Sequence, residues 1–213
     1  CVVTTSDDEL DFNGPDASIE SMGAAADLSL REAIYLANHA SEADTITFDS
    51  AVFTGGEESL IRLTLGELEI TDAVTIDGSM AIDVTITGDT NNDDVTVADT
   101  DITDVAASGA DLLDDNVRVF KITNWSADTT LDSLTITGGR GTTVGESNAS
   151  GGGIQSNGVL TVVNSMISGN SVSSDYSGGG GGISASHVTL TNSTVSGNTV
   201  TGIEIWGGGV GAE

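Results

Sequence analysis

The sequence is poor in the residues that many proteins use to hold a fold together or to bind polyanions. Its 213 residues include 1 Cys, 1 Pro and 5 Lys plus Arg, and only 4% are aromatic. A single cysteine excludes an intramolecular disulfide. The basic residues are scattered singly along the sequence, so we expect no binding to nucleic acid or to an anionic membrane. No apolar run is long enough for a membrane-spanning helix, so we also expect no membrane insertion.

Acid, glycine and β-forming residues are abundant instead. The chain has 33 Asp plus Glu, which gives a formal net charge of −28, and it has 28 Gly. Thr, Val, Ile and Ser dominate the remainder, which favours short strands joined by tight turns. The apolar fraction of 38% is sufficient to form a core. Acidic surfaces stay hydrated in salty or calcium-bearing media, so the charge favours a secreted or cell-surface protein.

The C-terminal third contains a sequence repeat that is evident by inspection. One unit spans residues 151–170 and the next spans 180–198, and both begin with Gly-Gly-Gly-Ile and end with Ser-Gly-Asn. The equivalent residues Asn164 and Asn192 are 192 − 164 = 28 positions apart. A weaker copy precedes them at 134–139, and another begins at Gly207. We therefore expect this sequence to be truncated at its C-terminal end and to belong to a longer protein.

A period of this length, with three short β segments and no helix, is typical of a parallel β-helix. Each turn cannot bury its inward Val, Leu and Ile alone, so successive turns stack about 4.8 Å apart and equivalent residues form ladders. Asn170 and Asn198 should stack in this way at a bend. A leucine-rich repeat would need a regular Leu spacing, and a propeller would need longer antiparallel repeats.

The N-terminal region differs from the repeats. Ser29 and Glu32 form a capping-box pattern ahead of apolar residues at helical spacing, which predicts a helix over about 30–39. We expect residues 1–57 to form a cap that covers the open β edge of a solenoid spanning 58–213. An acidic stretch at about 88–116 interrupts the strand pattern and is predicted to be an insertion.

Three segments of this region resemble a known family. Ser29–Ile34, Ala37–Ala40 and Ala43–Phe48 are similar to the CSLREA domain of large bacterial surface and secreted proteins. The tandem Gly-Gly-Gly-Ile and Asn-Ser-Thr-Val-Ser-Gly-Asn units resemble the repeats that follow that domain, and distantly those of polymorphic outer-membrane proteins. The resemblance implies an all-β, right-handed parallel β-helix with an N-terminal capping α-helix. The eponymous cysteine is Leu28 here and an upstream cysteine partner is also missing, so the disulfide that the resemblance leads us to expect in relatives cannot form.

Few residues indicate catalysis. A lyase acting on polyuronates needs cations, and Arg140 is the main candidate. A glycosidase needs two carboxylates, which Asp72, Asp77 and Asp83 could supply, although turn-capping aspartates are the better interpretation. His39 and His187 lie in unrelated segments and do not predict a shared site.

Calcium is the most credible ligand because oxygen donors recur at alternate positions within the acidic stretch. The predicted metal ligands are Asp89, Asn91, Asp93 and Asp94. A second, equally irregular set consists of Asp7, Asp8, Asp11, Asn13 and Asp16.

Thr-x-Thr pairs begin at Thr85, Thr135 and Thr189 and raise the question of ice binding. Ser168 and Ser196 replace threonine in the aligned repeats, so no continuous array is predicted.

The function predicted from these features is a non-catalytic, extracellular β-helix segment of a large bacterial surface protein or adhesin. It would act as a scaffold and as a binding surface for carbohydrate or for a host or cell-surface protein. The alternative is a carbohydrate-active enzyme of the β-helix class, either a polysaccharide lyase or a glycoside hydrolase. The last turn is expected to fray or to associate end to end with another copy.

Overall fold

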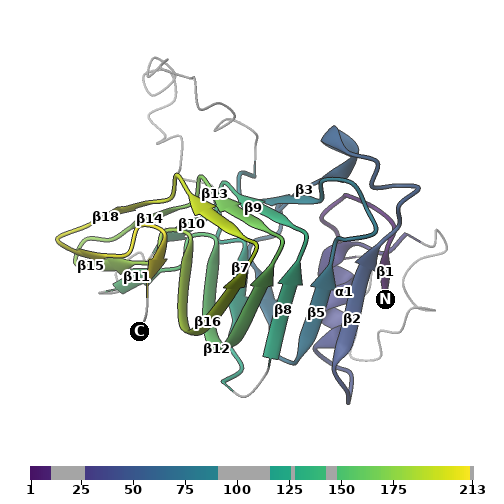
Figure 1. Ribbon diagram of the computed structural model, residues 1–213, viewed down its shortest axis with the longest axis horizontal. Coiled ribbons are helices and arrows are strands. Elements are labelled where there is room, and N and C mark those ends of the chain that lie inside the picture. Colours follow the sequence, from purple (N-terminus) through teal and green to yellow (C-terminus); the bar gives the residue numbers. More distant parts are fainter. Residues whose placement is uncertain (11–26, 91–115, 126–127, 143–147, 212–213) are drawn as a thin grey trace.

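The chain forms a right-handed parallel β-helix, as the sequence predicts (Figure 1). The computed structural model describes residues 1–10, 27–90, 116–125, 128–142 and 148–211. Every strand pair among these residues is parallel, and each pair joins strands of successive turns. The solenoid axis therefore runs across the strands.

Four sheets make up the walls of the solenoid within the described residues. Sheet A has nine strands: β1 (Val2–Val3), β2 (Asp44–Phe48), β4 (Leu68–Ile70), β5 (Val74–Asp77), β7 (Phe120–Ile122), β8 (Asp128–Asp132), β12 (Ile154–Val163), β16 (Ile183–Thr191) and β20 (Val210–Gly211). Sheet B has five strands: β3 (Leu60–Arg62), β6 (Thr85–Thr87), β9 (Thr135–Thr137), β13 (Met166–Ser168) and β17 (Thr194–Ser196).

The later turns add two small sheets. Sheet C contains β10 (Arg140–Thr142), β14 (Ser171–Ser173) and β18 (Thr199–Thr201). Sheet D contains β11 (Asn148–Ser150), β15 (Ser177–Gly179) and β19 (Glu204–Trp206). These strands have three residues each.

The core consists of inward side chains stacked in register. In sheet B one ladder contains Ile61, Ile86, Ile136, Ile167 and Val195. The first four are buried, and Val195 in the last turn is only half-buried. Ile86 and Ile136 thus each lie between isoleucines of the turns before and after them, which explains the alternation of apolar and polar residues in the strands.

The glycine triplets of the repeat occur where two turns meet most closely. Gly151 has a φ of +61°, which L side chains rarely adopt. A Cβ on Gly152 would lie 2.1 Å from the Ser171 carbonyl oxygen, and one on Gly153 would lie 3.0 Å from the Asn170 side chain. The triplet is therefore required by the corner and by the asparagine packed inside it.

The predicted asparagine ladder is confirmed. Asn170 is fully buried, and its Nδ2 donates to Asn198 Oδ1 at 3.0 Å and to the Ile136 carbonyl oxygen at 3.0 Å. Its Oδ1 accepts from the Gly139 N–H at 2.9 Å. The amide thus satisfies backbone groups that a corner would otherwise leave buried and unpaired.

The helix begins and ends as its sequence signals require. In α1 (Leu30–Ala37), the Glu32 N–H donates to Ser29 Oγ at 3.1 Å and the Ser29 N–H donates to Glu32 Oε2 at 3.0 Å, which completes the predicted capping box. The helix is two residues shorter than the predicted 30–39 because Asn38 is its C-cap. A 3₁₀ turn, η1 (Gly56–Ser59), lies between β2 and β3.

Helix α1 covers an open edge of sheet A at the end of the solenoid that carries the N terminus (Figure 1). Strand β4 pairs with β7 on one side, and α1 contacts its other side. Asn38 Nδ2 donates to the Glu69 carbonyl oxygen, and Asn38 Oδ1 accepts from the Thr71 N–H, both at 2.8 Å. One side chain therefore pairs backbone groups that an edge strand would otherwise leave unpaired.

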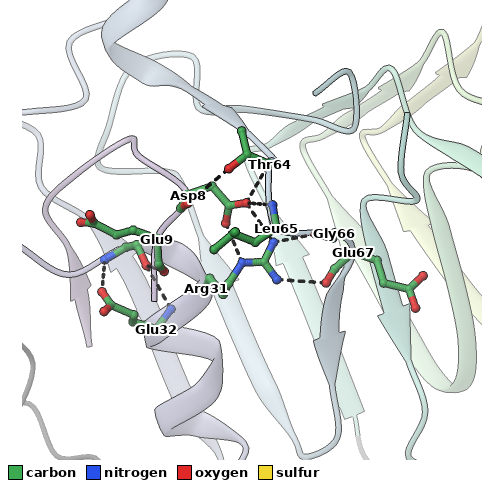
Figure 2. A network of polar contacts seen from close by, with 9 residues as sticks. Asp8, Glu9, Arg31, Glu32, Thr64, Leu65, Gly66 and Glu67 are labelled. Carbon is green, nitrogen blue, oxygen red and sulfur yellow. Dashed lines mark hydrogen bonds and ion pairs between the residues drawn. The ribbon is translucent and has the colours of Figure 1, made fainter. Parts of the chain in front are cut away.

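A buried ion pair fixes the helix to the first turn (Figure 2). Arg31 donates to both carboxylate oxygens of Asp8, at 2.6 and 3.0 Å, and to the carbonyl oxygens of Gly66 and Glu67, at 2.6 and 3.2 Å. Asp8 Oδ2 also accepts from the N–H groups of residues 64 and 65. This network joins three segments that are far apart in sequence.

The last turn exposes apolar side chains. The exposed set includes Leu190, Ile203, Ile205, Trp206 and Val210. Strands β17, β18 and β19 each have a single strand neighbour among the described residues. End-to-end association through this surface stays a prediction.

We expect Ile34→Asp to destabilise the protein by at least about 3 kcal/mol, or roughly 6–12 °C in Tm, because Ile34 is 3% exposed and the new carboxylate would be buried without a partner. Ile203→Asp is the matched control, since Ile203 is 79% exposed. Thermal unfolding measures both variants. Equal Tm values for the two would contradict the role assigned to α1.

We expect Asn170→Ala to cost about 3 kcal/mol or more in the free energy of unfolding. It leaves the Gly139 N–H and the Ile136 and Ser168 carbonyl oxygens without their side-chain partner, at about 1–3 kcal/mol for each buried group. Asn198→Ala should cost less, because its half-buried position lets water replace the amide. Denaturant titration compares the two, and an equal loss would show that burial of the ladder is unimportant.

Candidate binding groove at a corner of the solenoid

The corner between sheets A and B is built by one residue of unusual conformation in each turn. Asp83, Ser133, Asn164 and Asn192 have φ values of 50°, 57°, 47° and 50°. Short polar side chains tolerate this left-handed conformation because they can form local hydrogen bonds. The sequence places such residues at equivalent positions of four successive turns, so their side chains line one edge of the molecule.

Hydrogen bonds connect these side chains along the solenoid axis. Asn192 Nδ2 donates to Asn164 Oδ1 at 3.4 Å, and Asn164 Nδ2 donates to Asp132 Oδ1 at 3.0 Å. Ser133 Oγ donates to the same Asp132 oxygen at 2.8 Å. The ladder therefore holds the amides and the carboxylate in fixed orientations before any ligand arrives.

An open groove of about 460 Å³ runs along this corner. Its lining includes the four corner residues and three residues of sheet B: Thr135, Met166 and Thr194. Because these residues come from four turns, the groove extends over three steps of about 4.8 Å, or roughly 14 Å. Its volume falls within the range of small-molecule sites, and its length follows the axis.

The sheet B side of the groove alternates in polarity. Met166 pairs in register with Thr135 on one side and with Thr194 on the other. Met166 is 43% exposed, and neither threonine hydroxyl makes a hydrogen bond within the described part of the chain. The groove thus presents hydroxyl, thioether and hydroxyl groups in sequence beside the ladder of amides.

The favoured interpretation of the acidic residues around β5 is that they cap turns, and two of them do. Asp72 and Asp77 flank opposite ends of β5, and each accepts a hydrogen bond from a nearby backbone N–H, at 2.7 and 2.8 Å. The turn-capping interpretation is therefore correct for both. Asp77 also pairs in register with Asp132, so two carboxylates of neighbouring strands share the outer face of sheet A.

The predicted metal ligands fall mostly outside the described residues. Asn91, Asp93 and Asp94 are not described, whereas the Asp89 side chain is 5% exposed and lies 3.8 Å from Arg62 Nη1. In the part of the chain that the structure describes, no group of three or more His, Cys, Asp or Glu could hold a metal ion. Calcium binding by these four residues stays a prediction.

Asp8, from the second predicted calcium set, has a different role. Its side chain is 1% exposed and is bound to Arg31, so it serves the N-terminal network rather than an exposed ion site (Figure 2). Asp11, Asn13 and Asp16 of the same set lie outside the described residues.

The two histidines lie apart. His39 Nδ1 donates to the Tyr35 carbonyl oxygen at 2.8 Å, so the ring caps the end of α1 as a last-turn side chain should. His187 is exposed on β16.

Basic residues that are scattered in the sequence converge in space. Arg31 reaches the Glu67 carbonyl oxygen, while Arg118 and Lys121 lie 2.6 and 3.1 Å from the Glu67 carboxylate. Arg140 lines a cavity of about 180 Å³ together with Glu67 and Arg118. No spacing in the sequence links these residues, so sequence analysis missed the cluster.

A threonine ladder on sheet A was also missed. Five outward threonines pair in register across five strands: Thr45, Thr75, Thr130, Thr161 and Thr189. The adjacent column holds Thr47, Asp77, Asp132, Val163 and Thr191, which breaks the second row. A single column does not form the two-dimensional lattice that ice binding needs.

The chain was compared with protein-family models, with curated proteins and with solved structures, and none of them matches it. A membrane-crossing helix would have to be long and apolar, and the described residues contain none.

We expect millimolar calcium to raise the Tm, because nine aspartates lie between Asp89 and Asp115 and a bound divalent ion would relieve their repulsion. A ligand at 100 times its Kd adds about 2.7 kcal/mol to the stability. Replacing Asp93 and Asp94 by Asn should abolish the rise, whereas Asp175→Asn with Glu204→Gln, which removes two exposed acids elsewhere, should retain it.

Thermal unfolding in calcium and in magnesium at matched ionic strength tests this site. Equal shifts for the two ions would indicate charge screening alone, and no shift would exclude calcium binding.

Proposed function

We propose that the chain is a non-catalytic, extracellular segment of a large bacterial surface protein or adhesin, and that its solenoid acts as a scaffold and as a binding surface. The observation that carries the proposal is the groove over four turns, in which the amides of Asn164 and Asn192 are held by hydrogen bonds that join the turns. Such a groove favours a partner that extends along the axis, either a carbohydrate or a cell-surface protein.

The charge distribution supports an extracellular location. A formal net charge of −28 keeps a protein soluble in salty media, where ions screen the repulsion between acids. The resemblance to CSLREA-domain proteins points in the same direction, because those proteins are secreted or held at the bacterial surface.

A carbohydrate-active enzyme is the second candidate, and one observation favours it. Asp77 and Asp132 lie in register on neighbouring strands, which places two carboxylates at about the spacing that a retaining glycosidase uses. Both carboxylates already accept hydrogen bonds within the protein, however. Asp77 accepts from the Ser79 N–H, and Asp132 accepts from Ser133 and Asn164. These bonds favour a structural role over acid and nucleophile roles.

We expect the purified chain to be retained on immobilised polysaccharide or on surface glycoprotein and to release no new reducing ends from the polysaccharides it binds. Affinity electrophoresis measures retention, and a reducing-sugar assay on the same mixtures measures cleavage. Release that is lost in Asp77→Asn and in Asp132→Asn would establish the enzyme instead. Neither retention nor release on any material would refute the binding role.

A further inference from the structure

We infer that the groove between sheets A and B binds an uncharged polysaccharide chain that lies along the solenoid axis, with about one sugar residue per turn. This inference rests on the proposed function and specifies the class of ligand for the same groove. Three properties of the groove carry it: its spacing, its mixture of groups and its charge.

The spacing follows from the fold. Equivalent residues of successive turns are about 4.8 Å apart, which is close to the length of one pyranose residue in an extended chain. Asn164 and Asn192 therefore present the same amide to successive positions along the groove. A polymer with a repeating unit meets equivalent groups at each step, whereas a compact ligand would use only one of them.

The groups suit a sugar because a pyranose has hydroxyls at its edge and C–H groups on its face. Hydroxyls of Thr135 and Thr194 can exchange hydrogen bonds with the sugar edge, because no described residue bonds them. Met166 lies between these threonines and is 43% exposed, which offers a polarisable apolar contact for the C–H face.

The charge of the residues at the groove favours a neutral glycan over an acidic one. Asp83 lines the groove, and Asp132 lies behind Asn164 in the hydrogen-bonded ladder. No Lys or Arg is among the lining residues. A uronate or sulfate chain would therefore meet carboxylates without a compensating cation, in a chain whose formal net charge is −28.

Two variants test the assignment. Met166→Thr gives the ladder four threonines in a row, counted from Thr85 to Thr194, so it fits the strand while removing the apolar contact, and we expect about tenfold weaker binding. Asn192→Gly keeps the positive φ while removing one amide, and we expect about threefold to tenfold weaker binding. Val159→Thr is the control, because Val159 is 41% exposed on β12 and does not line the groove.

The probes are cellohexaose, xylohexaose and mannohexaose as neutral chains, hexagalacturonate as an anionic chain and a chitosan hexamer as a cationic chain. Ligand-observed NMR titration of the full chain measures each Kd, and circular dichroism checks that each variant is folded. We expect at least one neutral hexamer to bind more tightly than hexagalacturonate, and the two groove variants to weaken it while the control does not. Tighter binding of the chitosan hexamer would show that the groove carboxylates select a cationic chain instead.

The outcomes separate this inference from the proposed function. Tighter binding of a charged hexamer overturns the neutral class, and equal binding by the groove variants and the control overturns the location, while both leave a binding role in place. If no hexamer binds but the chain is retained on glycoprotein, the inference fails and the proposed role stands. If neither occurs, both fail.

Discussion

The in-register stacking of one turn on the next is the constraint on which the rest of the structure depends. Parallel pairing fixes the step along the axis, so a residue at one position of a turn always faces its equivalent in the next turn. Isoleucines inside sheet B then form a continuous apolar ladder, and asparagines at the glycine corner form a polar one. The outer residues follow the same rule, which is why the groove is as regular as the core.

Stacking leaves unpaired backbone groups at both ends of a solenoid. The two described ends differ in how these groups are covered. At the N-terminal end, α1 contacts β4, and its Asn38 replaces the missing strand partner for Glu69 and Thr71. The buried pair of Arg31 and Asp8 prevents the helix from moving away, because separating the two would leave a charge buried without its partner. At the other end, apolar side chains of the last described turn face solvent.

The sequence predicted the parts of this structure that depend on local pattern. The two clear repeats, the asparagine ladder at Asn170 and the capping box at Ser29 all follow from residue types at short, regular spacings. The threonine column of sheet A was missed because its members are 30, 55, 31 and 28 positions apart, as subtraction of Thr45, Thr75, Thr130, Thr161 and Thr189 shows. Turns of unequal length hide such a column until the register is known.

The candidate site was harder to predict for a related reason. Asn164 and Asn192 stand out as a repeated pair, but Ser133 and Asp83 occupy the same corner with different side chains, and only their shared positive φ identifies them. Convergence of Arg118 and Lys121 on Glu67 likewise depends on tertiary pairing between β4 and β7. Sequence analysis finds equivalent residues only when they are of the same type. In the solenoid, residues are equivalent because they occupy the same position in successive turns, whatever their type.

Binding in the proposed groove would be coupled to stability because the groove is made from the joints between turns. The bond from Asn192 to Asn164 and the bond from Asn164 to Asp132 each cross from one turn to the next. A ligand that spans several turns would therefore add contacts across the same joints, and it would stabilise the folded chain by an amount that rises with the logarithm of its concentration above the Kd. Since a solenoid unfolds by separating neighbouring turns, a bound polymer opposes the step that begins at an open end. A solenoid built in this way would become more resistant to unfolding when a polymer occupies the groove.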